Sequence, residues 1–193
     1  MVARTYHLAR SIRQRGEPQR AVERLKEHEH LKALEEWRVR LEGPRPSRQR
    51  VVGAILPSFA PWMDKCWNGS YRLTQVLTGH GCFGHYLHRI GRETSAQCHH
   101  CSDDEDDAQH TLEECPAWNT ERRTLISTIG ADLSPPAVVA AMLSGESHWR
   151  AMVTFCESVM TQKEAAERDR ERRDPARRRR RRRRAVAAVA VAV

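Results

Sequence analysis

Four soft metal ligands lie close together near the middle of the chain. The stretch QCHHCSDDEDDAQHTLEEC, residues 97–115, spaces them as Cys98-x2-Cys101-x8-His110-x4-Cys115. A Cys-x2-Cys turn holds two thiolates near enough to share one tetrahedral zinc ion, and a histidine and a third cysteine from a following helix complete it. Because three thiolates and one imidazole leave no open position, the spacing predicts a structural zinc site rather than a catalytic one. We expect short elements to converge on it.

Two other interpretations of the cysteines stay open at this point. The stretch can be an acidic loop with incidental cysteines, or the cysteines can form disulfides. The six cysteines of the chain are Cys66, Cys82, Cys98, Cys101, Cys115 and Cys156. The N-terminal residues lack the apolar segment of a signal peptide, and no apolar run reaches the roughly 20 residues that span a bilayer. We therefore expect an intracellular, reducing compartment and no membrane partner, and clustered cysteines there bind metal more often than they pair.

Neighbouring side chains refine the predicted site. His99 and His100 can compete as ligands, but they lie inside the Cys-x2-Cys turn, where we expect their side chains to point outward. The second ring nitrogen of His110 is expected to donate to a carbonyl or a carboxylate, and Glu113 and Glu114 are within reach.

Five consecutive acids, residues 103–107, fill the gap before His110. Paired carboxylates can hold magnesium, but no apolar strand frames them as a polymerase site requires. We interpret the run as a solvated loop that does not lie on phosphate.

The net charge of +8 arises from the C-terminal tail. Residues 168–184 hold 12 arginines against three acids, so the remaining residues hold 21 basic and 22 acidic side chains, a net charge of −1. The eight consecutive arginines 177–184 bind any polyanion at low salt. The folded part is therefore not basic overall, and we expect the tail to be a disordered, low-complexity segment.

The periodicity of apolar residues predicts an all-α fold, in which short helices surround a small Cys3His zinc knuckle. Helical patterns cover residues 4–42 (with an interruption at 16–18), part of 51–69, two segments within 71–91, and residues 116–130, 134–145 and 146–173. Strand patterns are almost absent. Composition divides the chain into a helical segment 1–50, a zinc-knuckle domain 51–165 and a basic end 166–193.

Several polar side chains outside the cluster have two possible roles. Arg89, Arg92, Arg122 and Arg123 can form a rim that faces phosphate, but they can equally be solvated helix positions. His80, Cys82 and His85 suggest a second metal site, although a glycine turn that reverses the chain is the simpler explanation. Trp118 is more typical of a core residue than of a platform for bases.

Three segments together resemble the C-terminal region of the polyprotein of non-LTR, LINE-type retrotransposons. They are LTQVLTGHGCFGHYLHRIGRE (residues 73–93), the Cys-x2-Cys turn CHHC, and AQHTLEECPAW (residues 108–118). The resemblance is greatest to the arthropod elements that insert into ribosomal DNA, and it covers about residues 30–170. It implies that Cys98, Cys101, His110 and Cys115 bind one zinc ion. It also implies that the module binds RNA or DNA in the nucleus and supports target-primed reverse transcription by an upstream reverse transcriptase domain.

Motifs for catalysis are missing from the sequence. A reverse transcriptase needs an aromatic-x-Asp-Asp hairpin, and no tyrosine here precedes an Asp pair. An endonuclease domain does not fit in the remaining length, and no nucleophile–base pair is visible. We therefore expect a non-catalytic C-terminal fragment of a polyprotein. The alternative is a zinc-stabilised scaffold for protein–protein interaction, which the near-neutral body and the acidic loop leave open.

Overall fold

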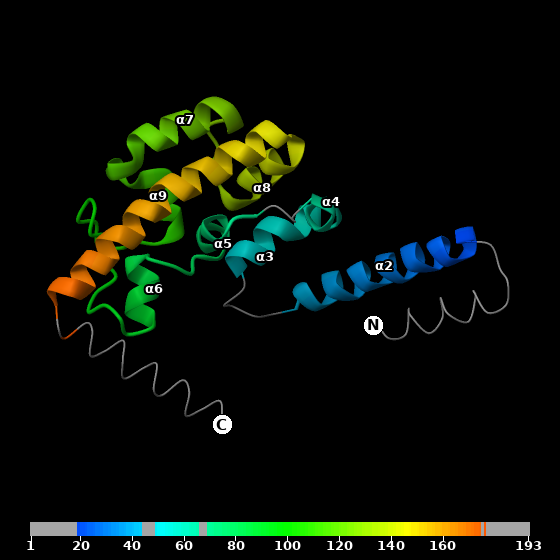
Figure 1. Cartoon of the computed structure of the whole chain (residues 1–193), viewed down its shortest axis with the longest axis horizontal. Coiled ribbons are helices and arrows are strands. Elements are labelled where there is room, and N and C mark those ends of the chain that lie inside the picture. Colours follow the sequence, from blue (N-terminus) through cyan, green and yellow to red (C-terminus); the bar gives the residue numbers. More distant parts are fainter. Residues whose placement is uncertain (1–18, 44–48, 66–68, 175, 177–193) are drawn as a thin grey trace, which may run out of the picture. The chain divides into compact units, whose positions relative to one another are not determined.

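A computed structural model describes residues 19–43, 49–65, 69–174 and 176 (Figure 1). Every regular element among these residues is a helix, which confirms the all-α prediction. The chain forms two compact units, Met1–Pro46 and Ser47–Val193. The predicted helix over residues 4–18, the Pro44 and Pro46 break, and the arginine run 177–184 lie outside the described residues.

The described part of the first unit is one helix, α2 (Gln19–Leu41). The sequence pattern places Leu31, Leu34, Trp37 and Leu41 on one apolar stripe. Leu31 and Trp37 are nevertheless 59% and 53% exposed, because no other described element of this unit covers them. Their spacing predicted the helix correctly but did not predict a buried face.

The second unit contains the remaining helices. In chain order they are α3 (Gln49–Ile55), η2 (Leu56–Ser58), α4 (Phe59–Lys65), α5 (Tyr71–Thr78), α6 (Gly84–Arg89), η4 (His110–Glu114), η5 (Pro116–Trp118), α7 (Asn119–Ile129), α8 (Pro135–Ser144) and α9 (Glu146–Arg173). Helix α9 is the longest, and α5, α7 and α8 pack on it, while α3 packs on α8 (Figure 1).

The core forms along one face of α9. Its stripe of Met152, Cys156, Val159 and Met160 is fully buried, as the 3/4 spacing of these residues requires for a helix packed on its neighbours. Each such side chain contributes about 1.5–3 kcal/mol through burial. The apolar stripe ends after Met160, so the last three turns of α9 must be held in another way.

Local sequence signals set the ends of the helices. The Ser70 hydroxyl accepts from the Leu73 N–H at 3.1 Å and caps α5, and Gly79 ends that helix with a positive φ of 70°. The two-helix prediction for residues 71–91 is thereby confirmed. Ser134 is the residue before α8, but its side chain makes no capping hydrogen bond. Its N–H donates to Asp132 Oδ1 at 2.9 Å.

None of the described helices combines the length and the apolar character required to cross a lipid bilayer.

Candidate metal centre

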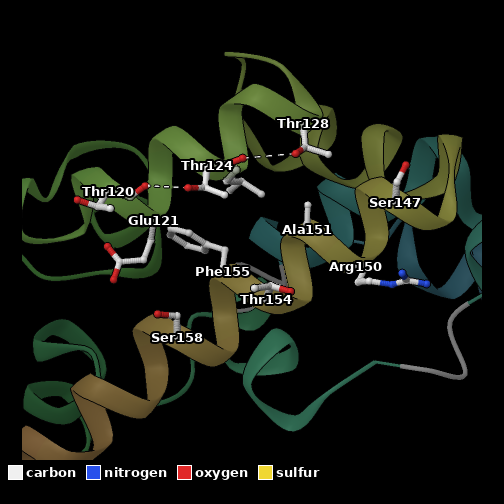
Figure 2. Close-up of a pocket in the computed structure, with 11 residues that line it drawn as sticks. Thr120, Glu121, Thr124, Thr128, Ser147, Arg150, Ala151, Thr154, Phe155 and Ser158 are labelled. Atoms are coloured by element: carbon white, nitrogen blue, oxygen red, sulfur yellow. Dashed lines mark hydrogen bonds between the residues drawn. The ribbon is translucent and has the colours of Figure 1, made fainter.

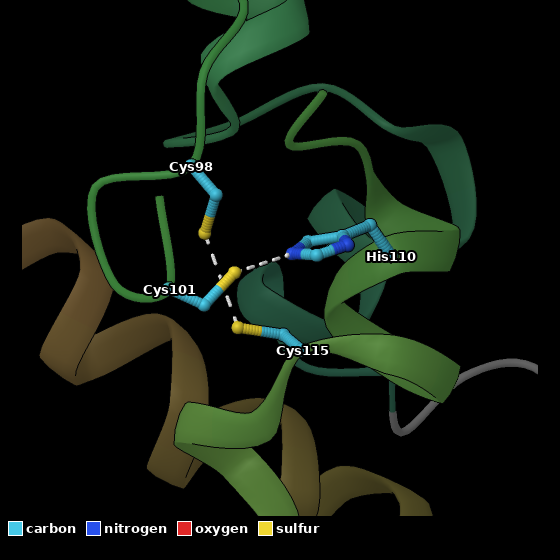
Figure 3. Close-up of side chains that lie close together, drawn as sticks. All are labelled: Cys98, Cys101, His110 and Cys115. Atoms are coloured by element: carbon cyan, nitrogen blue, oxygen red, sulfur yellow. Dashed lines mark hydrogen bonds between the residues drawn. The ribbon is translucent and has the colours of Figure 1, made fainter. Parts of the chain in front are cut away.

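The four side chains that the sequence predicted as ligands converge on one point (Figure 3). The ligand atoms of Cys98, Cys101, His110 and Cys115 all lie within 4.8 Å of one another. No second group of this kind is found in the described part of the chain, so His80, Cys82 and His85 form no such site there. His110, and neither His99 nor His100, is the histidine of this group.

The distances within the cluster fit one tetrahedral ion. Cys98 Sγ lies 3.9 Å from Cys115 Sγ, and Cys101 Sγ lies 3.2 Å from His110 Nε2. Bond lengths near 2.3 Å for Zn–S and 2.0–2.1 Å for Zn–N place tetrahedral ligands about 3.5–3.8 Å apart. The donor set can therefore hold a metal ion, and three thiols with one imidazole are consistent with zinc.

His110 and Cys115 meet because the helix that carries them is a single π turn, η4. The Cys115 N–H donates to the His110 carbonyl at 2.7 Å, five residues back. An α-helix of 3.6 residues per turn separates positions five apart by about 140°. The wider π turn brings them toward the same face. Asp107 begins this turn, because its Oδ1 accepts from the His110 N–H at 2.7 Å.

The Cys-x2-Cys segment forms a tight turn. The Ser102 N–H donates to the Cys98 carbonyl at 2.9 Å, and Ser102 has a positive φ of 65°. The Cys98 N–H donates to the Asp103 carbonyl at 2.8 Å, which closes the turn. Both thiols therefore face inward on one short loop, as the spacing predicts.

Gly84 allows the segment before this turn to cross α6. A Cβ at position 84 would lie 2.4 Å from the Ala96 carbonyl oxygen and 2.6 Å from that of Gln97, which no side chain tolerates. The start of α6 and the residue next to Cys98 are thereby in direct backbone contact.

Outer contacts orient the ligands. His110 Nδ1 lies 3.4 Å from Glu114 Oε2, so Glu114 rather than Glu113 is the carboxylate partner that the sequence predicted. His99 and His100 turn away, as expected. His99 Nε2 lies 3.2 Å from Glu93 Oε1, and the His100 ring stacks on Trp118 at 4.8 Å. Trp118 is 3% exposed, which confirms its role as a core residue.

Burial disfavours the thiolate form of the cysteines in the cluster when no cation is bound. It raises the pKa of Cys98 and raises the pKa of Cys115 to about 12. Metal binding removes these protons, because a thiolate bound to zinc is stabilised by the charge of the ion. Without a cation the buried thiols of Cys98 and Cys115 therefore stay protonated.

Arg122 stabilises the π turn through hydrogen bonds to its backbone. Its guanidinium donates to the Leu112 carbonyl at 2.8 Å, the Cys115 carbonyl at 2.6 Å and Asn119 Oδ1 at 2.6 Å. The Leu112 carbonyl lies at the end of a helix and has no partner within it. The Cys115 carbonyl also accepts from the Trp118 N–H at 3.2 Å. Arg122 is 7% exposed, so its guanidinium serves the backbone next to Cys115 and faces no solvent.

The acidic run is not only a solvated loop, which corrects the sequence prediction. Asp106 is 2% exposed, and its carboxylate accepts from Lys163 Nζ at 2.7 and 2.9 Å. It also accepts from the Gly84 N–H at 2.9 Å and from Thr111 Oγ1 at 3.2 Å. Asp106 therefore connects α6, the π turn and α9. The hydrogen bonds that it accepts compensate for the solvation that its carboxylate loses on burial.

Further ion pairs extend this connection along α9. Arg92 pairs with Glu167 at 3.3 Å and with Glu171, and Arg170 Nε lies 3.7 Å from the buried Glu93 carboxylate. Together with the Asp106–Lys163 pair they attach the last turns of α9, where the apolar stripe has ended, to the segment that carries the cluster.

The structure does not gather the four predicted phosphate-facing arginines into one rim. Arg92 pairs with α9, and Arg122 is buried under the π turn. Arg89 and Arg123 are exposed, and Arg89 lies 5.2 Å above the Tyr86 ring. Of the four guanidiniums, only those of Arg89 and Arg123 are therefore exposed and without an acidic partner within the described residues.

A groove of about 570 Å³ lies between α7 and α9 (Figure 2). Its walls carry several hydroxyls, but those of Thr124 and Thr128 donate to backbone carbonyls of their own helix at 3.2 and 3.4 Å. Leu125 and Phe155 also line the groove. Its lining includes no cysteine or histidine, so it is chemically separate from the cluster.

One protein of known family is similar to this chain. The retrovirus-related Pol polyprotein of type-1 retrotransposable element R1 4 from Nasonia vitripennis is 32% identical over 82 residues. The matched part is 42% of this chain and 21% of that protein. No protein-family model matches the chain, and no solved structure matches it.

The chain thus contains a segment related to a retrotransposon Pol polyprotein, as the sequence motifs predicted. The Cys98, Cys101, His110 and Cys115 cluster of the described residues could hold a metal ion.

Proposed function

We propose that this chain is a nucleic-acid-binding zinc module from the C-terminal part of a retrotransposon polyprotein. In this role it supports target-primed reverse transcription by a reverse transcriptase domain located upstream. The observation that carries the proposal is a closed Cys3His cluster in a chain similar to a Pol polyprotein. When bound, zinc supplies four strong bonds that hold the turn at Cys98 against the π turn.

The module has a positioning role rather than a catalytic one. Its four donors fill a tetrahedron, so no position is left for water or substrate. The rest of the proposal follows the sequence resemblance. The chain comes from an element of the arthropod group that inserts into ribosomal DNA, and it acts in the nucleus. It consists of a connecting segment 1–50, a zinc-knuckle domain 51–165 and a basic end 166–193. Ribosomal DNA on both sides of the coding locus, and nuclear fluorescence of the tagged chain, are the expected observations.

Metal binding is tested by native mass spectrometry of the purified chain. We expect one zinc ion in the wild type and none in His110→Ala or Cys115→Ser. Cys82→Ser is the matched control, because Cys82 is a thiol outside the cluster and its loss leaves the zinc in place. Absence of zinc from the wild type, or zinc that survives both ligand substitutions, contradicts the proposed site.

Nucleic-acid binding is tested with a chain truncated after Asp174. This position keeps Arg170 and Glu171, which hold the end of α9, and removes the arginine run. We expect fluorescence anisotropy to show that the truncated chain still binds a single-stranded RNA oligonucleotide near physiological salt. If binding disappears with the tail, the folded part is a protein–protein scaffold, and the nucleic-acid function is wrong.

A further inference from the structure

The exposed side of α6 consists of aromatic and basic side chains. His85, His88 and Arg89 are exposed and Tyr86 is half-buried, whereas Leu87 points into the core at 1% exposure. Successive residues of a helix are about 100° apart, so these four positions share one arc of the helix surface. No residue of α6 is acidic. This surface is therefore unlike the rest of the body, whose net charge is close to zero.

Two of these side chains, Tyr86 and Arg89, form a stack with His80 of the turn before α6. The His80 and Tyr86 rings lie 4.9 Å apart, and the Arg89 guanidinium carbon lies 5.2 Å from the Tyr86 ring centroid. We call His80, Tyr86 and Arg89 the α6 stack. A guanidinium is flat on both sides, so one that rests on an aromatic ring can take a nucleobase on its outer side.

Neighbouring acids have other partners. Glu105 pairs with His85 at 2.7 Å, and Glu93 with Arg170 and His99. Within the described residues no carboxylate pairs with Arg89 or His88. The charge of Arg89 and the ring nitrogens of His88 are therefore available to the phosphate next to a stacked base.

We infer that the α6 stack, together with His88, is where the module binds single-stranded nucleic acid, with a base stacked on Arg89 and Tyr86 and a phosphate beside Arg89 and His88. This inference rests on the proposed nucleic-acid function and assigns its surface. A single strand fits because its bases are free to leave the chain and stack on a protein ring. One short helix with a three-member stack offers no long basic face for a duplex groove.

The test uses the chain truncated after Asp174 and a uniform single-stranded oligonucleotide, with anisotropy titrations at several salt concentrations. Arg89→Gln is expected to weaken binding about tenfold and to lower the magnitude of the salt slope by about 0.7, the value for one phosphate contact on a single strand. Tyr86→Leu is expected to weaken binding by a similar factor, because stacking is lost, and to leave the salt slope unchanged. Tyr86→Phe keeps the ring and should bind like the wild type.

Arg150→Gln is the matched control, because Arg150 is exposed on α9, far from α6 in sequence, and pairs only with Glu146 in a solvent-exposed bridge. Circular dichroism and zinc content verify that each variant is folded. If the truncated wild type binds but Arg89→Gln and Tyr86→Leu bind as tightly as Arg150→Gln, the α6 stack is not the surface, and the proposed function stands without it. If the truncated wild type does not bind at all, the proposed function itself is wrong.

Discussion

The buried pair of Asp106 and Lys163 gives the sharpest test of how this unit is held together. The side chains of Lys163 and Asp106 are 0% and 3% exposed. Asp106 receives two bonds from Lys163, one from the Gly84 N–H and one from Thr111 Oγ1. Lys163 otherwise rests 5.3 Å from the Phe83 ring, a contact that cannot replace a carboxylate.

Asp106→Ala and Lys163→Met are expected to lower the free energy of unfolding by different amounts. Asp106→Ala leaves a buried ammonium and frees two further donors, so it should cost about 5 kcal/mol, the upper end of the range for breaking a buried pair. Lys163→Met leaves Asp106 with the donors of Gly84 and Thr111, so it should cost about 3 kcal/mol. In Asp106→Asn/Lys163→Met no charge is buried, and the amide oxygen still accepts from Gly84.

Urea unfolding of the zinc-loaded chain, followed by circular dichroism at neutral pH, measures these differences. The double variant should be less destabilised than the sum of Asp106→Asn and Lys163→Met by about 2 kcal/mol or more, which is the coupling between the two groups. A cost below about 1 kcal/mol for Asp106→Ala, or additive single effects, would refute the argument that this pair is buried and holds α9 to the cluster.

Three further predictions concern single positions. Gly84→Ala is expected to cost about 2–3 kcal/mol because the added methyl meets backbone oxygens, whereas Gly53→Ala in α3, where a Cβ has open space, should stabilise by about 0.5–1 kcal/mol; thermal unfolding of both checks this. Arg122→Met should cost about 2–4 kcal/mol in urea unfolding and weaken zinc binding, because it removes a charged donor from the Leu112 and Cys115 carbonyls, while the exposed Arg123→Met should change stability by less than about 0.5 kcal/mol. Burial raises the pKa of Cys156, so the folded state holds the thiol proton more tightly than the unfolded chain does. The contribution of this proton to the free energy of unfolding is fully present below about pH 8.5. It is lost as the pH rises further, by at most about 1.4 kcal/mol per pH unit. Cys156→Ala should flatten that alkaline decline, and an unchanged pH profile would contradict a buried thiol.

The metal cluster could be predicted from sequence because its ligands are near one another along the chain. The Cys-x2-Cys spacing fixes a tight turn without help from distant residues, and His110 and Cys115 belong to one helical turn. The helices around it were also predictable, because proline, glycine and the 3/4 spacing of apolar residues are local signals. Even the partner of His110 was within the predicted pair of glutamates.

The roles of the charged side chains could not be predicted in this way. Asp106 is one of five adjacent acids, and nothing in the run distinguishes it from its exposed neighbours. Arg122 and Arg123 are likewise adjacent arginines, of which one is buried and one exposed. Which of two neighbours is buried depends on the partner that the fold brings opposite it, and Lys163 lies 57 residues from Asp106.

The sequence by itself thus determined the helical class, the four ligands of the cluster and the relation to a retrotransposon polyprotein. All of these rest on spacing within short segments, where the geometry of the backbone leaves little freedom. Only the tertiary structure decided that Asp106 and Lys163 form a buried pair, that Arg122 supports the π turn, and that Arg89 keeps an exposed guanidinium on Tyr86. The energy of a charged side chain depends on its distance from other charges and on its exposure to water. Both are set by how the chain packs rather than by the order of its residues.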